Sequence, residues 1–207
     1  YKANRGETPE DLIPQFDIIR DCVDAFNIPQ IEIQGYEADD IIATYCKLAK
    51  NMKIDSIIVS SDKDLMQLVT KDITMLDPMK NRKIGIDQVI EKFGLPPEKV
   101  IQIQALTGDK VDNIPGAPGI GPKTALQLIE EFGDVNNLIN NANKIPQEKR
   151  RNVILDHKED ILVSLELVKL KDDIKLPLDI NKIHTYSSVN KNDNLSKFLS
   201  NQGFKSI

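Results

Sequence analysis

Three tight clusters of acidic residues stand at the ends of apolar segments, and they restrict how this chain can fold. Like charges at this density repel one another, so a fold that gathers the clusters needs cations to offset the repulsion. Carboxylate oxygens select Mg²⁺ or Mn²⁺ over zinc. The members are Glu37, Asp39 and Asp40 in GYEADD, Asp62 and Asp64 in SSDKD, and Asp109 and Asp112 in TGDKVDN.

Each cluster alone also has an ordinary structural explanation. Acids in the first turn of a helix complement the helix dipole, which would account for residues 37–40. Asp62 and Asp64 could cap a turn, and a loop with two acids and a glycine is common. Two of the clusters, however, lie at expected strand-to-helix transitions, and ligands of parallel α/β sheets bind beyond the carboxyl ends of strands. Taken together, the three clusters favour a metal site.

Apolar periodicity predicts an α/β part that extends to about residue 95. In the first helix, Thr8 is a suitable cap and Pro9 fits the first turn. The run SIIV at 56–59 is continuously apolar, so we expect a strand buried on both faces. We expect a hairpin-like connection, PMKN, between the last two strands. The predicted helices are 8–27, 37–52, 64–70 and 87–94, and the predicted strands are 31–33, 56–59, 73–77 and 82–86.

Beyond Pro97 the strand signals fade, and the sequence predicts a helical part. We therefore expect two domains, an α/β core over residues 1–95 and a helical region over 96–207. Residues 171–187 have the character of an irregular connection. The expected helices are 97–107, 123–132, much of 147–170, and 192–202.

A glycine-rich segment, IPGAPGIGPKTA, joins two of these helices. Gly116, Gly119 and Gly121 permit close approach of the backbone to another group. The next helix begins near Lys123 and Thr124, where free amides and a positive charge suit a phosphate. The alternative is an ordinary tight turn. Acidic clusters beside a phosphate-binding hairpin indicate an enzyme that hydrolyses nucleic acid.

The remaining features exclude other classes of site. The net charge of −5 argues weakly against a nucleic-acid partner. The seven clustered acids alone carry more negative charge than this total, so the net charge has little weight against such a partner. Cys22 and Cys46 match no metal or redox spacing, so we expect reduced thiols in a cytoplasmic protein, with Cys46 near the buried face of its helix. His157 and His184 have no partner at ligand spacing and are expected at the surface or in packing. No apolar run approaches the ~20 residues that span a bilayer.

The chain resembles the 5′-nuclease domain of bacterial DNA polymerase I, which belongs to the flap endonuclease superfamily. The resemblance follows the order of the sequence, covers nearly the whole chain, and rests on YKANR, GYEADDIIA, SSDKDLMQLV, ALTGDKVDNIPGAPGIGPKTA and LIEEFG. It implies a PIN-like α/β fold, with a parallel-rich sheet flanked by helices, followed by a helix–hairpin–helix motif at about 97–133 that grips duplex DNA. The family has further strands, with two aspartates, upstream of YKANR. Because this sequence starts at Tyr1, after both, we expect a fragment.

The resemblance also implies roles for individual residues. The seven clustered acids would surround two or more Mg²⁺ ions. Lys2 and Arg5 would hold the scissile phosphate, and Tyr1 would stack on a base. The hairpin from Gly116 to Gly121 would hold a K⁺ ion through backbone oxygens. The implied partner is DNA with 5′ ends, flaps or nicks, bound by a monomer that is fused to polymerase domains.

Three functional hypotheses remain open at this point. The first is a Mg²⁺-dependent 5′-3′ exonuclease and 5′-flap endonuclease of replication and repair, which hydrolyses phosphodiesters with two metal ions. The second is a non-catalytic module that binds duplex DNA, suggested by the intact hairpin and the missing upstream strands. The third is a free-standing 5′-nuclease without a polymerase, which shares every motif with the first.

Overall fold

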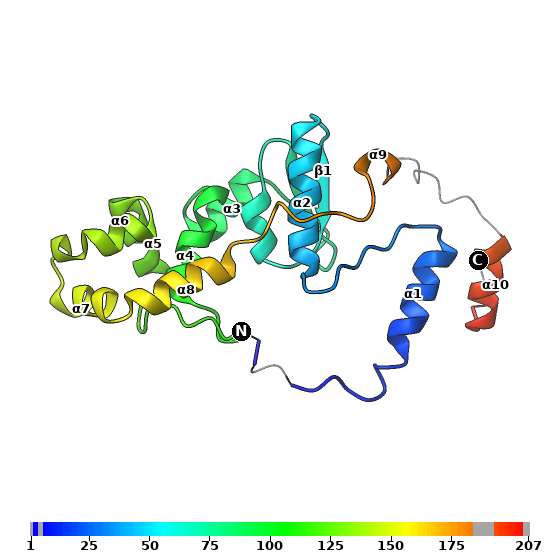
Figure 1. The fold of residues 1–207 in the computed structure, drawn as a ribbon, viewed down its shortest axis with the longest axis horizontal. Coiled ribbons are helices and arrows are strands. Elements are labelled where there is room, and N and C mark those ends of the chain that lie inside the picture. Colours follow the sequence, from blue (N-terminus) through cyan, green and yellow to red (C-terminus); the bar gives the residue numbers. More distant parts are fainter. Residues whose placement is uncertain (1, 4–5, 184–192, 205–207) are drawn as a thin grey trace. The chain divides into compact units, whose positions relative to one another are not determined.

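The computed structural model describes residues 2–3, 6–183 and 193–204. The chain divides into two compact units, one formed by residues 1–5 and 39–174 and the other by residues 6–38 and 175–207. The first unit holds the sheet and the helices from α2 to α8, and the second holds α1, α9 and α10 (Figure 1). The predicted boundary near residue 95 differs from this division and stays a prediction.

A small mixed sheet forms one side of the first unit. Its strands are β1 (Ser56–Val59), β2 (Ile73–Asp77) and β3 (Arg82–Ile84), in the order β1-β2-β3. β1 runs parallel to β2, and β2 pairs with β3 as an antiparallel hairpin, as predicted. β3 ends at Ile84, two residues earlier than expected, because Gly85 already caps the helix that follows.

The expectation that β1 is buried on both faces is wrong. Ile58 is 5% exposed and packs in a core with Cys46 and Met75, but Ile57 and Val59 are 65% and 63% exposed. β1 lies at the edge of the sheet, and the described residues cover only one of its faces. A continuous apolar run therefore forms a strand here with one buried side.

Helices cover the other side of this small core. α2 (Ala38–Asn51) packs on the sheet through Cys46, which is a buried free thiol as predicted. α3 (Ile86–Phe93) follows the hairpin and ends just before Gly94, as predicted. The predicted helix 64–70 is instead a short 3₁₀-helix, η1 (Asp64–Leu68), because Val69 is already extended and enters the core. η2 (Pro97–Lys99) leads into the helical part.

The helical part has its own core, and the described residues after β3 form no further strand. α4 and α8 lie along each other, drawn in green and yellow in Figure 1. Buried side chains from α4, α5, α6, α7 and α8 share one apolar cluster. The elements are α4 (Val100–Thr107), α5 (Pro122–Phe132), α6 (Val135–Asn140), η3 (Ala142–Lys144), α7 (Glu148–Asp156) and α8 (Lys158–Val168).

In the second unit, the first predicted helix begins seven residues late. α1 (Gln15–Ala25) starts after Pro14, and residues 10–14 form turns. Proline has no amide hydrogen, and its ring collides with the carbonyl group four residues earlier, so a helix cannot run through it from Thr8. Thr8 is therefore not a helix cap, and Pro9 is not in a helical first turn.

Other parts of the second unit also differ from expectation. Residues 31–33 do not form the predicted strand, because no strand among the described residues pairs with them. The described part of the expected irregular connection, up to residue 183, contains the short helix α9 (Ile180–Ile183). α10 (Asp193–Asn201) matches the predicted last helix. Across the described parts of the chain, no helix combines the length and the apolar character that crossing a membrane requires.

Candidate active site

The loop after β1 carries an acidic pair beyond the carboxyl end of the parallel strands, as predicted. The backbone amide of Asp62 donates to Ser60 Oγ at 3.0 Å, and the amide of Asp64 donates to Asp62 Oδ1 at 2.9 Å. The Asp62 carboxylate is therefore turned back onto the start of η1. This arrangement keeps the two acids as close neighbours.

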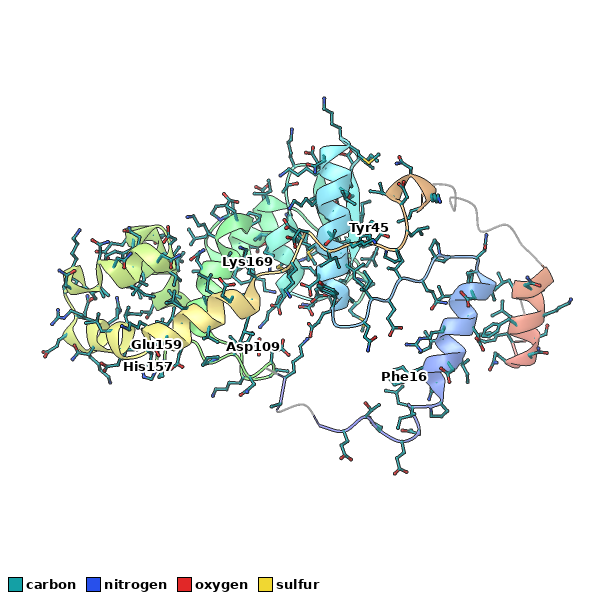
Figure 2. All side chains as sticks on the ribbon, in the orientation of Figure 1. Phe16, Tyr45, Asp109, His157, Glu159 and Lys169 are labelled. Atoms are coloured by element: carbon teal, nitrogen blue, oxygen red, sulfur yellow. The ribbon has the colours of Figure 1, made fainter. Side chains whose placement is uncertain are left out.

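A second acidic loop meets this pair through a lysine. Lys63 Nζ lies 2.5 Å from Asp109 Oδ2, although the residues are 46 positions apart. Asp109, labelled in Figure 2, follows α4. Paired backbone hydrogen bonds with Ile114 close its loop. Asp109 Oδ1 accepts hydrogen bonds from the amides of Val111 at 2.8 Å and Asp112 at 3.3 Å. We call the group formed by Asp62, Lys63, Asp64 and Asp109 the acidic corner.

The electrostatics of the acidic corner are unequal. Burial raises the pKa of the Asp64 carboxyl, the charge of Asp62 raises it further, and a hydrogen bond from Gln104 opposes both. Burial acts to raise the pKa of Asp109 as well, but the hydrogen bond from Lys63 and two backbone amides outweigh it and lower that pKa. The same bond to Asp109 raises the pKa of Lys63. The lysine thus neutralises Asp109 and leaves repulsion around Asp64.

The acids of GYEADD start α2 and have a separate anchor. Asp40 Oδ1 accepts a hydrogen bond from the amide of Lys171 at 2.9 Å, and Asp40 O accepts one from Thr44 Oγ1 at 2.8 Å. Asp39 precedes Asp40 in the first turn of the helix. Glu37 belongs to the second unit, and its role as a metal ligand stays a prediction.

The segment that anchors Asp40 also bonds to η1. Gln67 Nε2 donates to Val168 O at 3.0 Å and to Asp64 O at 2.9 Å, and Gln67 Oε1 accepts from Leu170 N at 3.3 Å. Residues 168–171 therefore connect α2 to the 3₁₀-helix that carries Asp64. This connection links Asp40 of the first acidic cluster to the element that carries Asp64, within the first unit, through hydrogen bonds between side chains and backbone.

The donors of the acidic corner suit a hard divalent cation in type, because its acids offer oxygen ligands alone. Repulsion around Asp64 would also be relieved by a cation. Among the described residues, however, no three carboxylate, imidazole or thiolate groups lie close enough to share one ion. The ammonium group of Lys63 already takes the position of a counter-ion on Asp109. The seven-residue ligand set stays a prediction.

The predicted phosphate-binding residues at the N-terminus are described only in part. The backbone amide of Lys2 donates to Asp112 O at 2.8 Å, which fixes Lys2 beside the loop of the third acidic cluster. Tyr1 and Arg5 lie outside the described residues. Of the two histidines, His157 contacts Asp160 at 2.9 Å near the start of α8, as expected for a surface residue, and His184 also lies outside the described part (Figure 2).

A cavity of about 240 Å³ opens beside the acidic corner. Its walls are partly apolar, and Gln104, 8% exposed, is the most buried polar residue among them. Lys92 lies 5.5 Å from the ring centre of Phe93, and burial lowers the pKa of this lysine. The polar and aromatic residues of the wall include Lys63, Asp64, Lys92, Phe93, Gln104 and Asp109.

The glycine hairpin between α4 and α5 is fixed by contacts to α4 and α8. Gly116 N donates to Ser164 Oγ at 2.9 Å, and Ala117 N donates to Leu106 O at 2.8 Å. Gly121 precedes the first residue of α5, and Lys123 and Thr124 lie in the first turn of that helix, as predicted. The hairpin is therefore a rigid element with the start of α5 at its end.

Two basic residues lie next to the hairpin and were not predicted from the sequence. A second cavity, of about 340 Å³, is lined by Gly119 and Thr124 on the hairpin side and by Lys149 and Arg150 at the start of α7. The basic run KRR at 149–151 was the available signal. The third residue, Arg151, has a structural contact, since its Nη1 donates to Ile145 O at 2.8 Å.

Two family descriptions match consecutive parts of the chain. Residues 1–94 match the family described as 5′-3′ exonuclease, N-terminal resolvase-like domain, and residues 95–192 match 5′-3′ exonuclease, C-terminal SAM fold. DNA polymerase I of Rhizobium leguminosarum is 56% identical over 183 residues, which are 88% of this chain and 18% of that protein. A 5′-3′ exonuclease of Aquifex aeolicus is 39% identical over 178 residues, 86% of this chain and 60% of that protein.

Solved structures give the same picture. The T5 5′-exonuclease with bound zinc ions superposes with a TM-score of 0.73 at 26% identity, covering 97% of this chain and 72% of that one. A bacteriophage T5 flap endonuclease, solved as a pseudo-enzyme–product complex with DNA and metal ions, gives a TM-score of 0.69 at 26% identity over 96% and 71% of the two chains. Compared with the DNA polymerase I relatives, the chain spans less than a quarter of their length.

Proposed function

This chain belongs to the 5′-3′ exonuclease family, and we propose that it hydrolyses DNA phosphodiesters as a metal-dependent 5′-3′ exonuclease and 5′-flap endonuclease. One observation carries the proposal above the others. The Lys63–Asp109 contact joins two acidic loops at the carboxyl end of β1, and the loop that carries Asp109 runs directly into the glycine hairpin. The proposed reaction site around Asp64 and the proposed DNA-backbone-binding hairpin therefore belong to one unit.

We assign the cation-holding role to the carboxylates of the three acidic clusters. When bound, Mg²⁺ or Mn²⁺ would supply an activated water and neutralise charge on the phosphate. Lys2, beside Asp112, would hold the scissile phosphate together with Arg5, and Tyr1 would stack on a base. The full set of ligands is Glu37, Asp39, Asp40, Asp62, Asp64, Asp109 and Asp112.

The hairpin would hold the duplex part of the substrate. Its backbone amides and the start of α5 suit phosphate oxygens, and this contact reads no sequence. Lys149 and Arg150 would extend that contact across the second cavity. A K⁺ ion held by backbone oxygens between Gly116 and Gly121 is part of the proposal.

The biological setting follows from the relatives. We propose that the substrate is DNA with 5′ ends, flaps or nicks, met during primer or flap removal in replication and repair. The DNA polymerase I relatives carry this domain in a longer chain, so we propose a cytoplasmic monomer joined to polymerase domains. The variant of this proposal is a free-standing nuclease without polymerase domains, since the chain also matches 60% of the Aquifex aeolicus 5′-3′ exonuclease.

Cleavage of a 5′-labelled flap substrate with Mg²⁺ tests the function. We expect Asp62→Ala to lower the cleavage rate by more than about 100-fold, since even outer contacts of a metal site contribute about 10- to 100-fold. Asp55→Ala is the control, because Asp55 is exposed at the opposite end of β1. Equal loss in both variants, or in neither, would contradict the assignment of the acidic corner.

The second candidate, a non-catalytic module for duplex DNA, is favoured by one observation. No three ligand groups among the described residues lie close enough to share an ion. This candidate predicts salt-sensitive binding of duplex DNA without hydrolysis. Mg²⁺-dependent turnover of the flap substrate by the chain would exclude it.

A further inference from the structure

One buried polar residue interrupts an otherwise apolar helix. On α4, the neighbours Val100, Ile103, Ala105 and Leu106 are all buried in the core, and Gln104 lies among them at 8% exposure. Burying an amide is unfavourable unless hydrogen bonds replace its contacts with water. The buried amide of Gln104 therefore needs hydrogen bonds at both its nitrogen and its oxygen, and among the described residues only the nitrogen has one.

Gln104 is satisfied on one side of its amide group. Its Nε2 donates to Asp64 Oδ1 at 2.5 Å, across 40 residues of sequence. Its Oε1 is buried and has no hydrogen-bond partner within the described part of the chain. The orientation of the amide follows from the bond to Asp64, since a carboxylate accepts and only the NH₂ group donates.

A second glutamine in the same place provides the contrast. Gln67 also bonds to Asp64, but through the backbone carbonyl, and its other amide contacts are to the backbone of Val168 and Leu170. Both ends of its side chain are satisfied by backbone groups. Gln67 is therefore a structural residue, while Gln104 bonds to the functional end of Asp64.

The unsatisfied oxygen belongs to a residue of the cavity wall. Gln104 lines the cavity of about 240 Å³ together with Asp64 and Asp109, but its Oε1 is itself buried, so a polar group in that cavity reaches this oxygen only after the side chain moves. The group must be a hydrogen-bond donor, because Oε1 accepts only. Mg²⁺ and Mn²⁺ in carboxylate sites keep several bound waters, and such waters are donors.

We propose that Gln104 is a positioning residue of the cation site. Its Nε2 fixes the Asp64 carboxylate through Oδ1 and would leave the other oxygen to help hold a hydrated divalent cation, while its Oε1 would move to accept a hydrogen bond from a water of that cation. This inference rests on the proposed function, since it requires the acidic corner to take a cation. It adds a residue from the helical part that belongs to none of the three acidic clusters.

Mn²⁺ binding to the 207-residue chain tests the proposal, with free Mn²⁺ followed by electron paramagnetic resonance. Gln104→Met keeps the length of the side chain and removes both polar atoms. We expect its Mn²⁺ affinity to fall by about 10- to 100-fold, as for other outer contacts of metal sites. Its thermal midpoint without metal should change little, because removal of the unpartnered oxygen offsets loss of the hydrogen bond to Asp64.

Gln67→Met is the matched control. It should lower the thermal midpoint, because several backbone hydrogen bonds are lost, and change Mn²⁺ affinity less than Gln104→Met does. If Gln104→Met does not fold, Gln104→Leu replaces it in the same titration. Wild-type Mn²⁺ affinity in the folded Gln104 variant would overturn the proposal.

Flap cleavage in parallel separates this inference from the proposed function. Weakened Mn²⁺ binding in the Gln104 variant, in a chain that cleaves no substrate, would support the positioning role and overturn the nuclease function. Cleavage and Mn²⁺ binding at wild-type levels in the variant would support the nuclease function and overturn the positioning role. A wild-type chain that binds no Mn²⁺ would overturn the positioning role itself.

Discussion

The glycine hairpin approaches α4 so closely that replacing Gly116 by alanine should destabilise the first unit. Gly116 has a φ of +60°, and an added Cβ would lie 2.8 Å from Gly108 Cα and from the carbonyl carbon of Thr107, and closer still to Gly108 N. All three atoms belong to the backbone, so no side chain can rotate away. Hydrogen bonds to Ser164 and Leu106 hold the hairpin in this position.

The magnitude has two parts. A left-handed conformation costs an alanine about 1–2 kcal/mol. Forcing an extra carbon against fixed neighbours costs about 1–3 kcal/mol. The free energy of unfolding should therefore fall by about 2–5 kcal/mol, which corresponds to a decrease in Tm of about 4–20 °C for a chain of this size.

Gly119→Ala is the matched control in the same hairpin. Gly119 has a φ of +78°, but no described atom lies within 4 Å of its added Cβ, so only the backbone cost of about 1–2 kcal/mol applies. Urea unfolding followed by far-ultraviolet circular dichroism measures both variants. If Gly116→Ala is no more destabilising than Gly119→Ala, the close packing of the hairpin on Gly108 is wrong.

Three further predictions concern other sites. Burial raises the pKa of Cys46 to about 11, so a maleimide at pH 8 should label Cys22 alone in the native chain and both thiols in guanidinium; rapid double labelling of native chain would contradict this. A hydrogen bond from a serine hydroxyl lowers the folded pKa of Asp77, so its stabilising contribution is present above the unfolded pKa of about 4 and is lost as pH falls through the folded value. Asp77→Asn should therefore lose less stability than wild type between pH 6 and acid, measured by urea titration, and parallel curves would refute the sign. Lys149→Ala and Arg150→Ala should each reduce, by about 0.9, the slope of log K for duplex DNA binding against log salt concentration, measured by fluorescence anisotropy. An unchanged slope would exclude that residue from the DNA interface.

Local chemistry explains which elements were predictable from the sequence. The start of α5 is set by Gly121 and Pro122, and the β2–β3 hairpin is set by its own turn, so short stretches of sequence suffice for both. The acidic pair 62–64 was predictable because the end of β1 fixes where its loop begins. These features depend on residues that are close in sequence, and hydrophobic periodicity and turn residues are enough to predict them.

Features that depend on distant neighbours could not be predicted. The apolar run of β1 has the same composition whether one face or two are covered, and only the tertiary structure shows Ile57 exposed. The bond between Gln104 and Asp64 joins residues 40 positions apart, and nothing in the helix around Gln104 indicates it. Lys149 and Arg150 were not predicted as site residues for the same reason. Their position beside the hairpin depends on where the tertiary structure places α7.

The Lys63–Asp109 ion pair has a consequence for how the protein responds to chelators. A tethered ammonium group already balances one carboxylate of the corner, so the loops after β1 and α4 stay joined when divalent ions are withdrawn. Chelation should therefore stop hydrolysis while the circular dichroism spectrum stays native. A cation held by Asp109 in the proposed site would displace this lysine, so cation uptake would compete with a side chain of the protein itself.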